Sequence, residues 1–309
     1  MKVCIIWGWA AGMMAAATVA ENSSHEVHVF EKNNLLWAKV IISWWWRCNV
    51  TTWYVKKQEL QKKYIRWRDF LQDSISQFWP RKMRQWVEAH DVPLKCEDDM
   101  RVFPQSDNGK DIVWIFERIF DEKNVRIHYK EWIDSLTHSE WQFTVITKHT
   151  TYQFDAVVIT TWGNAYAHTW SSWDGYELVK PLWHTTTPLW PSLNSFLVQE
   201  EWIKVLSGIS FSNAQIYYEK AKVVWPVLLT HFGTSGPAVF AFSAHSSFET
   251  IDKQTPLPIK LMPFAERNME WRTHWLNELV VNSPKKQFKT VLWFEFPDRF
   301  ADALIRALG

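Results

Sequence analysis

The arrangement of the first 31 residues constrains the fold of this chain more than any other feature. Residues 2–6 form a short apolar run typical of a buried strand, and a helix is expected over about 10–21. Residues 26–30 then alternate between polar and apolar side chains, as a second strand does. Two strands joined by a helix over this length make one βαβ unit, so the pattern predicts an α/β fold built on a parallel sheet.

The turn between the first strand and the helix has the spacing of a dinucleotide-binding loop. In G-x-G-x-x-G, glycine stands where the backbone turns tightly, where it approaches a pyrophosphate and where the helix packs on the strand. Positions 7, 9 and 12 have this spacing, but Trp7 and Trp9 replace two of the three glycines. An indole at position 9 would occupy the phosphate site. Glu31, 19 residues after Gly12, stands where an acid would accept hydrogen bonds from a ribose.

The composition shows the same exchange across the whole chain. The sequence contains 9 glycines and 23 tryptophans, whereas a chain of this length ordinarily has roughly 22 glycines. Three consecutive tryptophans, Trp44–Trp46, would expose a large apolar surface without an evident partner. Three glycines would instead form a backbone able to wrap a cofactor. The identity of these residues therefore decides how each motif is interpreted.

The remaining pattern predicts further elements. Helices are expected over 56–76, 81–90 and 110–123, a hairpin over 95–103 and a strand over 125–129. A three-stranded meander is expected over 133–137, 141–147 and 151–154, followed by a central parallel strand at 156–160. Short strands are expected at 204–206, 215–218 and 227–229, and helices from about 264.

Three more motifs follow the first in a fixed order. They are 42–49 (I-S-W-W-W-R-C-N), 158–176 (V-I-T-T-W-G, then T-W-S-S-W-D-G-Y) and 230–237 (T-H-F-G-T-S-G-P). With the first turn and Glu31-Lys32, they make the chain resemble, from residue 2 to about 240, the bacterial FAD-dependent flavoproteins related to aminoacetone oxidase. Tryptophan stands where that family has glycine at Trp7, Trp9, Trp37, Trp44, Trp45, Trp46, Trp162, Trp170, Trp173 and Trp183.

The resemblance implies a glutathione-reductase-like FAD-binding Rossmann domain with a β-meander over residues 1–184. A substrate domain would be inserted over 185–309, β-rich to about 262 and helical over 263–309. In the family the chain then returns to complete the FAD domain, and we expect this return to be absent here. We therefore expect the 309-residue chain, with its tryptophans, to hold FAD weakly and to be inactive.

The resemblance also implies a set of cofactor contacts. The FAD pyrophosphate would lie on the turn, Glu31 would bind the adenosine ribose, and Ile133 would offer its backbone to the adenine unless it is an ordinary core residue. Arg47 would pair with a phosphate or form a surface salt bridge, and Cys48 is interpreted as a small buried residue because no second cysteine stands at disulfide-reductase spacing. The complete set is Trp7, Gly8, Trp9, Ala10, Ala11, Gly12, Glu31, Lys32, Ser43, Trp44, Trp45, Arg47, Cys48, Asn49, Ile133, Thr161, Trp162 and Gly163.

The implied activity is hydride transfer between FAD and a small organic substrate, with no catalytic residue and no metal ligand assigned. Either an amine would be oxidised by O₂, or an unsaturated bond would be reduced with NAD(P)H visiting the flavin transiently. His231 would face the flavin as a proton donor, or would be a loop histidine that satisfies backbone groups. A single-Rossmann NAD-dependent dehydrogenase and a non-enzymatic tryptophan-rich binding module stay open as alternatives.

Charge and cysteine content limit the partners. The net charge of +1 gives no basic excess for phosphate binding, so no nucleic-acid partner is expected, and no membrane partner is expected either. Three scattered cysteines fit a reducing compartment, and we expect a cytoplasmic protein. The apolar stretch 3–20 also imitates a signal peptide or a short membrane span, which stays open as an alternative.

A change of genetic code would explain the misplaced tryptophans. Some bacterial lineages read UGA as glycine, and another non-standard code reads it as tryptophan. Translating a gene of the first kind with the second code converts only UGA-encoded glycines, which leaves the observed mixture of glycine and tryptophan in the motifs. The sequence therefore predicts UGA codons at these positions.

Overall fold

The fold is described from a computed structural model of the chain. The structure describes residues 1–37, 40, 46–161, 163, 174–263, 265, 273–275, 277–278, 281–282 and 296–308. It divides into two compact units, Met1–Thr187 and Pro188–Gly309, and each is described by itself. No helix among the described residues is both long enough and apolar enough to cross a membrane.

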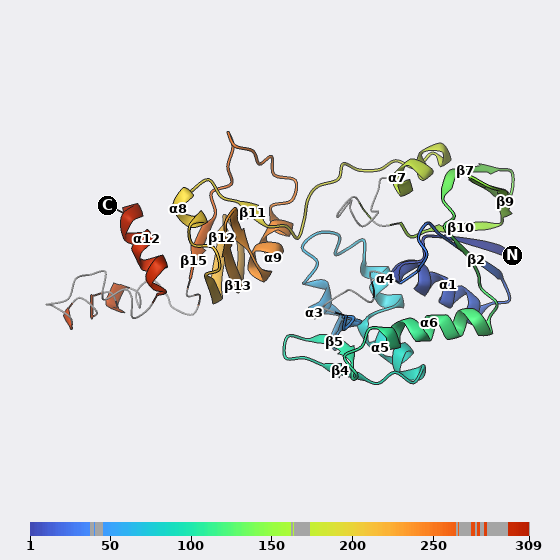
Figure 1. Ribbon diagram of the computed structural model, residues 1–309, viewed down its shortest axis with the longest axis horizontal. Coiled ribbons are helices and arrows are strands. Elements are labelled where there is room, and N and C mark those ends of the chain that lie inside the picture. The colour runs from blue at the N-terminus through green and yellow to red at the C-terminus, as the bar shows by residue number, and fades with distance from the viewer. Residues whose placement is uncertain are drawn as a thin grey trace. The chain divides into compact units, whose positions relative to one another are not determined.

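The first unit is built on a parallel sheet. Its strands are β1 (Lys2–Ile6), β2 (Glu26–Glu31), β6 (Arg126–Tyr129) and β10 (Ala156–Ile159), in the order β10-β1-β2-β6. Helices α1 (Ala10–Asn22) and α6 (Lys110–Glu122) lie side by side (Figure 1) and cover one face. The chain moves outward from β1 to β2 and β6, then crosses back to β10, so the order reverses between β1 and β10. Ligands bind parallel α/β sheets at such a reversal.

The two faces of the sheet are covered by different layers because successive side chains of a strand point to opposite faces. Ile5 and Val29 pack toward the helices, whereas Ile6 and Phe30 pack toward the meander. The meander consists of β7 (Ile133–Ser139), β8 (Gln142–Thr147) and β9 (Thr151–Phe154), paired antiparallel. The predicted α/β fold with a Rossmann-type parallel sheet and a β-meander is confirmed.

Two details of the first unit differ from the sequence-based expectation, and the first concerns the sheet. The predicted parallel pairing of 156–160 is confirmed, but β10 is an edge strand of the sheet that the described residues form, and all its residues are only half-buried. The prediction of a central strand was wrong because an apolar run such as Ala156–Ile159 is equally compatible with a strand that pairs on one side, as this one does with β1.

The single helix predicted over 56–76 was also wrong. The structure has two short helices, α3 (Lys57–Gln61) and α4 (Gln72–Gln77), separated by a non-helical stretch. Trp67 in this stretch has a left-handed backbone, with φ of +64°, which ends helical propagation. Leu60 and Ile75 are the buried residues of the two helices, so the periodic pattern lacks a continuous core to pack on.

The rest of the first unit follows the predicted pattern. Helix α5 (Pro80–Ala89) precedes the predicted hairpin, whose strands are β4 (Leu94–Cys96) and β5 (Arg101–Pro104). Strand β3 (Thr51–Thr52) adds to β5. Helix α7 (Asp174–Val179) and a 3₁₀ turn, Lys180–Leu182, end the unit.

The second unit contains an antiparallel sheet, in the order β11-β14-β13-β12-β15. Its elements are β11 (Phe196–Leu197), α8 (Glu201–Lys204), β12 (Ser210–Tyr218), β13 (Ala221–Thr230), β14 (Gly233–Ser235), α9 (Pro237–His245), β15 (Lys260–Met262) and α12 (Asp298–Leu308). The strand predicted at 204–206 was wrong, because Glu201 begins a helical turn there and Leu206 packs into the core behind it. Most of the region predicted as helical beyond 264 lies outside the described residues.

Candidate functional site

The turn after β1 has the close approach that a dinucleotide loop requires at its last glycine. A Cβ atom on Gly12 would lie 1.8 Å from the carbonyl oxygen of Trp7 and 2.7 Å from the hydroxyl of Thr160. Only glycine therefore lets α1 begin this close to the turn. Trp7 has a φ of +78°, in the left-handed region that favours glycine, and Trp9 is the N-cap of α1 with an extended backbone.

Glu31 ends β2 beside this turn. Its side chain is fully buried, and its Oε2 accepts a hydrogen bond from the backbone N–H of Gly8 at 3.2 Å. Oε1 accepts from the backbone N–H of Asn33 at 2.9 Å and from its side-chain Nδ2 at 2.7 Å. Burial raises the pKa of Glu31 above its usual value, and these hydrogen bonds oppose the rise. Asn33 was not among the predicted site residues, although an amide two residues after an acid is a common local partner.

The two indoles of the turn fill the space around it. Trp7 and Trp9 are both buried, with ring centroids 5.1 Å apart in an edge-on arrangement. The Lys32 ammonium lies 4.3 Å from the Trp7 ring and 4.3 Å from the Trp132 ring. Ile133 is buried in the same cluster. Four of the predicted contacts, at 7, 9, 32 and 133, are thus brought together, with the Trp7 indole between the turn and Lys32.

The end of β10 lies against the same turn. The backbone N–H of Thr160 donates to the carbonyl of Ile6 at 3.0 Å, and the Thr160 hydroxyl lies 2.8 Å from the Ile6 carbonyl and 2.7 Å from that of Trp7. Thr160, which stands where the resembling family has alanine, joins the two strands at the point of reversal. No sequence pattern had indicated this role, because its partners lie more than 150 residues away.

Thr161 and Gly163 come just after Thr160, past the end of β10. A Cβ on Gly175 would lie 1.8 Å from the hydroxyl of Thr161, so the start of α7 packs closely on this residue. A cavity of about 360 Å³ opens here, and it is lined by Ile159, Thr161, Gly175, Tyr176, Val179, His184, Thr185 and Thr186. It lies at the carboxyl end of β10, next to two predicted flavin contacts. Trp162 lies outside the described residues.

The loop at 46–49 is held by the hairpin and by the start of α6. The Trp46 carbonyl accepts from the N–H of Gly109 at 2.8 Å. The Arg47 guanidinium pairs with Glu97 and with Asp107, which raises its pKa, and it lies 4.0 Å from the Phe103 ring. Arg47 thus forms salt bridges, which is one of the two roles that the sequence had left open, the other being a phosphate contact. Ser43, Trp44 and Trp45 lie outside the described residues.

Asn49 and Cys48 follow Arg47 in this loop. The Oδ1 atom of Asn49 is buried and has no hydrogen-bond partner within the described part of the chain. A buried carbonyl oxygen of this kind costs free energy unless a donor reaches it. Cys48 is a buried thiol in the core that includes Met13 and Leu36.

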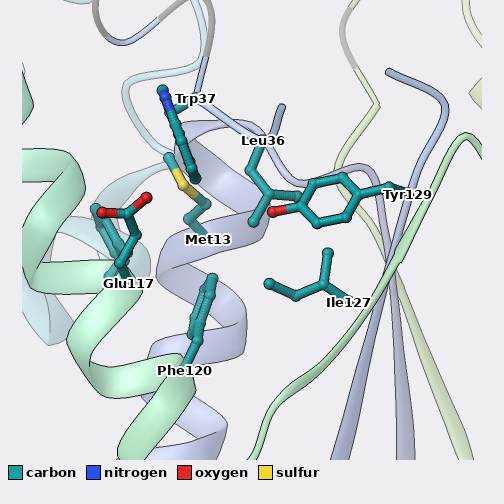
Figure 2. Close-up of a pocket in the computed structure, with 8 residues that line it drawn as sticks. Met13, Leu36, Trp37, Glu117, Phe120, Ile127 and Tyr129 are labelled. Atoms are coloured by element: carbon teal, nitrogen blue, oxygen red, sulfur yellow. The ribbon is translucent and has the colours of Figure 1, made fainter. Parts of the chain in front are cut away.

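A smaller apolar cavity, of about 70 Å³, lies on the helix side of the sheet. Met13 from α1, Phe120 from α6 and Ile127 from β6 point toward it, and Tyr129 and Trp37 lie at one end (Figure 2). Glu117 is the carboxylate at its edge. None of these residues belongs to the predicted contact set, and the cavity is too small for a nucleotide.

A polar cluster at the start of β2 was not predicted. His28 Nε2 lies 3.0 Å from Glu26 Oε1, and His28 Nδ1 lies 2.9 Å from Nε2 of His128. A neutral His28 can donate to the carboxylate and accept from His128. Burial lowers the pKa of both histidines. The pair spans 100 residues of sequence, so no local pattern could have indicated it.

His231, which the sequence left open between a proton donor or acceptor at the flavin and a loop histidine, lies in the second unit. It is exposed between β13 and β14, with its ring 5.0 Å from that of Phe232. Its position toward a flavin stays a prediction.

FAD fits the backbone and the polar groups of the first unit. The Gly12 approach, the buried Glu31 carboxylate and the Asn49 Oδ1 that no group of the described residues reaches are features that suit a dinucleotide at the end of a βαβ unit. The indole of Trp7 does not fit, because it occupies the space between the turn and Lys32. Glycine at position 7 would free that space. Strand order and site together define a Rossmann-type dinucleotide-binding protein.

The comparison with protein families agrees with this class. Residues 1–273 match the family described as HI0933-like protein Rossmann domain, and the chain belongs to it. This is an FAD-binding family within the NAD(P)/FAD-dependent oxidoreductases. The predicted FAD-dependent oxidoreductase is confirmed at this level, and the closer relation to aminoacetone oxidase stays a prediction.

Two curated relatives cover most of the chain. It is 21% identical, over 94% of this chain and 68% of the relative, to the 3-dehydro-bile acid delta(4,6)-reductase of Clostridium scindens. It is 23% identical, over 91% of this chain and 71% of the relative, to the ribosomal RNA dihydrouridine synthase of Escherichia coli.

Similarity to solved structures is weaker. The chain is similar to the bacillithiol disulfide reductase Bdr of Staphylococcus aureus, with 14% identity, a TM-score of 0.28 and coverage of 52% of this chain. The match spans 37% of that protein, less than two thirds of its length. The fold assignment therefore rests on the strand order of this chain and on the family match.

Proposed function

We propose that this protein reduces a carbon–carbon double bond conjugated to a carbonyl group, using FAD and NAD(P)H. The observation that supports FAD as the cofactor is the buried Glu31 carboxylate, which accepts a hydrogen bond from the Gly8 N–H at the end of the first βαβ unit. The net reaction adds a hydride from NAD(P)H and a proton to the double bond, and the nicotinamide is oxidised. FAD, when bound, supplies the hydride chemistry.

The relatives favour reduction over amine oxidation. The name of each relative implies a substrate with a double bond next to a carbonyl group. For the first it is a 3-oxo bile acid with double bonds at positions 4 and 6, and for the second it is the uracil ring of a uridine in ribosomal RNA. The two substrates differ greatly in size and polarity, and they share only this conjugated group. The shared chemistry is therefore what we transfer to this chain.

The chain's own residues have distinct roles in this proposal. Glu31 holds the ribose of the cofactor, and the N-terminus of α1 receives the pyrophosphate. The cavity at Thr161 receives the flavin ring or the substrate beside it, and its hydroxyl groups, including that of Tyr176, supply hydrogen-bond donors for a substrate carbonyl. Because the substrate becomes more negative at its oxygen during hydride addition, such donors lower the barrier.

We also propose that Trp7, Trp46 and Trp183 are glycine in the organism's own reading of the gene. All three were assigned to glycine positions from the sequence, and all three have left-handed backbones, with φ of +78°, +71° and +65°. Such a φ is uncommon outside glycine, and among other residues it favours Asn, Asp and His rather than tryptophan. Trp67 also has a left-handed backbone, with φ of +64°, although no motif had indicated a glycine there. Ten described non-glycine residues other than tryptophan share this conformation, so the codon at position 67 is tested together with the other three.

The codons provide a direct test of this reading. UGA at positions 7, 46, 67 and 183 is the expected result, and UGG at positions 7, 9 and 44–46 would exclude it. Trp9 has an extended backbone with φ of −83°, so its glycine would be required by the approach of a phosphate rather than by backbone strain.

The proposed activity can be tested with the glycine-substituted protein, supplied with excess FAD and NAD(P)H without oxygen. We expect oxidation of the nicotinamide that depends on a 4-en-3-one steroid or on a uridine-containing oligonucleotide, with the saturated product found by mass spectrometry. Oxygen consumption with aminoacetone, and no reduction of either compound, would support amine oxidation and overturn the proposal.

A further inference from the structure

We propose that residues 62–70 form a docking surface for a single-stranded nucleic acid. The segment connects α3 to α4, has the sequence K-K-Y-I-R-W-R-D-F, and is exposed at every one of its nine positions. It is called the 62–70 surface below.

The 62–70 surface displays large apolar side chains that a folded chain ordinarily buries. Phe70 is 76% exposed, and Tyr64 and Ile65 are each 40% exposed. The neighbouring Val55 and Phe78 are exposed as well. Trp67 is left out of this argument because its codon is among those that we expect to encode glycine. Exposed aromatic groups gathered in one segment indicate a binding site rather than scattered surface residues.

Basic side chains stand beside these aromatic groups along the segment. Within the nine positions, Lys62, Lys63, Arg66 and Arg68 stand against a single acid, Asp69. Just before them, Lys56 and Lys57 stand against Glu59, with Lys56 paired to Glu59 at 3.4 Å. The positive and negative charges of the whole chain almost cancel, giving a net charge of +1, but this segment has a local positive excess. A positive patch attracts phosphates through its local charge.

The combination of cations and exposed rings selects the kind of partner. A membrane surface favours an amphipathic helix with its apolar residues on one face and its basic residues on the other. The 62–70 surface is not helical, and its basic side chains stand on both sides of Tyr64 and before Phe70 along the chain. Single-stranded nucleic acid has both phosphates that pair with cations and bases that stack on aromatic rings, so its chemistry matches this combination.

The proposal can be tested with the full chain and fluorescein-labelled oligonucleotides of about twelve nucleotides. Fluorescence anisotropy would be measured with oligouridylate and with oligothymidylate, between about 50 and 200 mM salt. We expect Lys62→Gln/Lys63→Gln/Arg66→Gln/Arg68→Gln to weaken binding at least about tenfold and to lower the salt slope by about 0.7 for each phosphate that the variant leaves unneutralised. Tyr64→Ala/Phe70→Ala should weaken binding at least about thirtyfold with the slope unchanged.

A matched control removes four exposed lysines elsewhere. Lys123→Gln/Lys148→Gln/Lys220→Gln/Lys253→Gln changes the net charge equally and should leave the affinity unchanged. Binding of either oligonucleotide that follows this pattern supports the proposal. The oligonucleotide that binds more tightly shows whether the partner is RNA or DNA. Absence of binding to both strands, equal loss in the control, or binding only to phosphatidylserine vesicles would overturn it.

Discussion

Strand β2 begins with one glutamate and ends with another, and the two carboxylates have opposite environments. At the start, the hydrogen bond with His28 and the charges of Arg126 and Lys2 hold the pKa of Glu26 below its usual value. At the end, burial raises the pKa of Glu31, and its hydrogen-bond donors are backbone and amide N–H groups instead of cations.

We propose that this difference separates a structural carboxylate, Glu26, from a cofactor-binding one, Glu31. The charge of Glu26 is already compensated by side chains of the chain, so the carboxylate contributes to holding the sheet. Glu31 accepts its hydrogen bonds from the N–H groups of Gly8 and Asn33, and it lies at the edge where α/β sheets bind ligands. The following predictions test whether the two ends of β2 differ in this way.

The largest effect is expected at the turn beside Glu31. Gly12→Ala places a Cβ 1.8 Å from the Trp7 carbonyl oxygen, so the backbone must shift, and we expect a loss of about 2–4 kcal/mol in the free energy of unfolding. Gly163→Ala is the stability control, because the nearest atom, the Tyr176 hydroxyl oxygen, would be 3.6 Å away. Urea denaturation of both variants measures the difference, and equal losses would show that the close approach is not required.

Removing the Trp7 indole should increase cofactor affinity. Trp7→Gly frees the space beside Lys32 and removes a left-handed tryptophan, so we expect FAD to bind at least about tenfold more tightly than to the parent chain, which is about 1.4 kcal/mol. Quenching of FAD fluorescence measures this change. Trp141→Gly, at an exposed position in the meander, should have no effect. An unchanged FAD affinity in Trp7→Gly would place the adenosine elsewhere.

Exchanging each carboxylate of β2 for an amide compares its two ends directly. We expect Glu31→Gln to weaken FAD binding by about tenfold, since a charged acceptor for the ribose is removed. Without FAD, a raised pKa means that the stabilising contribution of Glu31 is lost as pH rises above about 4.5, so the stability of the parent relative to this variant should fall between pH 4.5 and pH 7. Glu26→Gln should lower the melting temperature and leave FAD binding unchanged. The reverse pattern would contradict the assignment of the two ends.

The smallest effect is a pH dependence at the start of β2. Burial lowers the pKa of His28 and His128, so the unfolded chain takes up protons first as the pH falls below about 6.5. We expect the melting temperature to fall by about 2–4 °C between pH 7.5 and pH 5.5. His28→Gln/His128→Gln should flatten this dependence, and His149→Gln, at an exposed position, should preserve it. A double variant with the parent's pH dependence would exclude the pair as its source.

The sequence predicted best the features that depend on neighbouring residues. The alternation in Glu26–Phe30 and the spacing from Gly12 to Glu31 were enough to place a strand, a turn and an acid that the structure brings together. Local pattern failed at 56–76, where apolar periodicity exists without a core to receive it, and at Ala156–Ile159, where apolar content did not reveal how many neighbours the strand has.

Interactions between distant residues could not be predicted from a single sequence. Thr160 meets the turn after β1, and His128 meets His28, only because the sheet order places their strands together. The interior of the turn is a different case: the indole of Trp9 was expected at a phosphate site, and in the structure it is buried in the core cluster that includes residues of the meander.

The hydrogen bonds of Thr160 also have a kinetic consequence. Its amide hydrogen is held by the Ile6 carbonyl, and its hydroxyl proton has two carbonyl acceptors, at Ile6 and Trp7, between which it can alternate. Separating the two sides of the sheet reversal would break both the amide and the hydroxyl interactions at once. Although Thr160 lies just past the end of a strand, its amide hydrogen should therefore exchange with deuterated solvent as slowly as those in the middle of β1, and only when that whole layer opens.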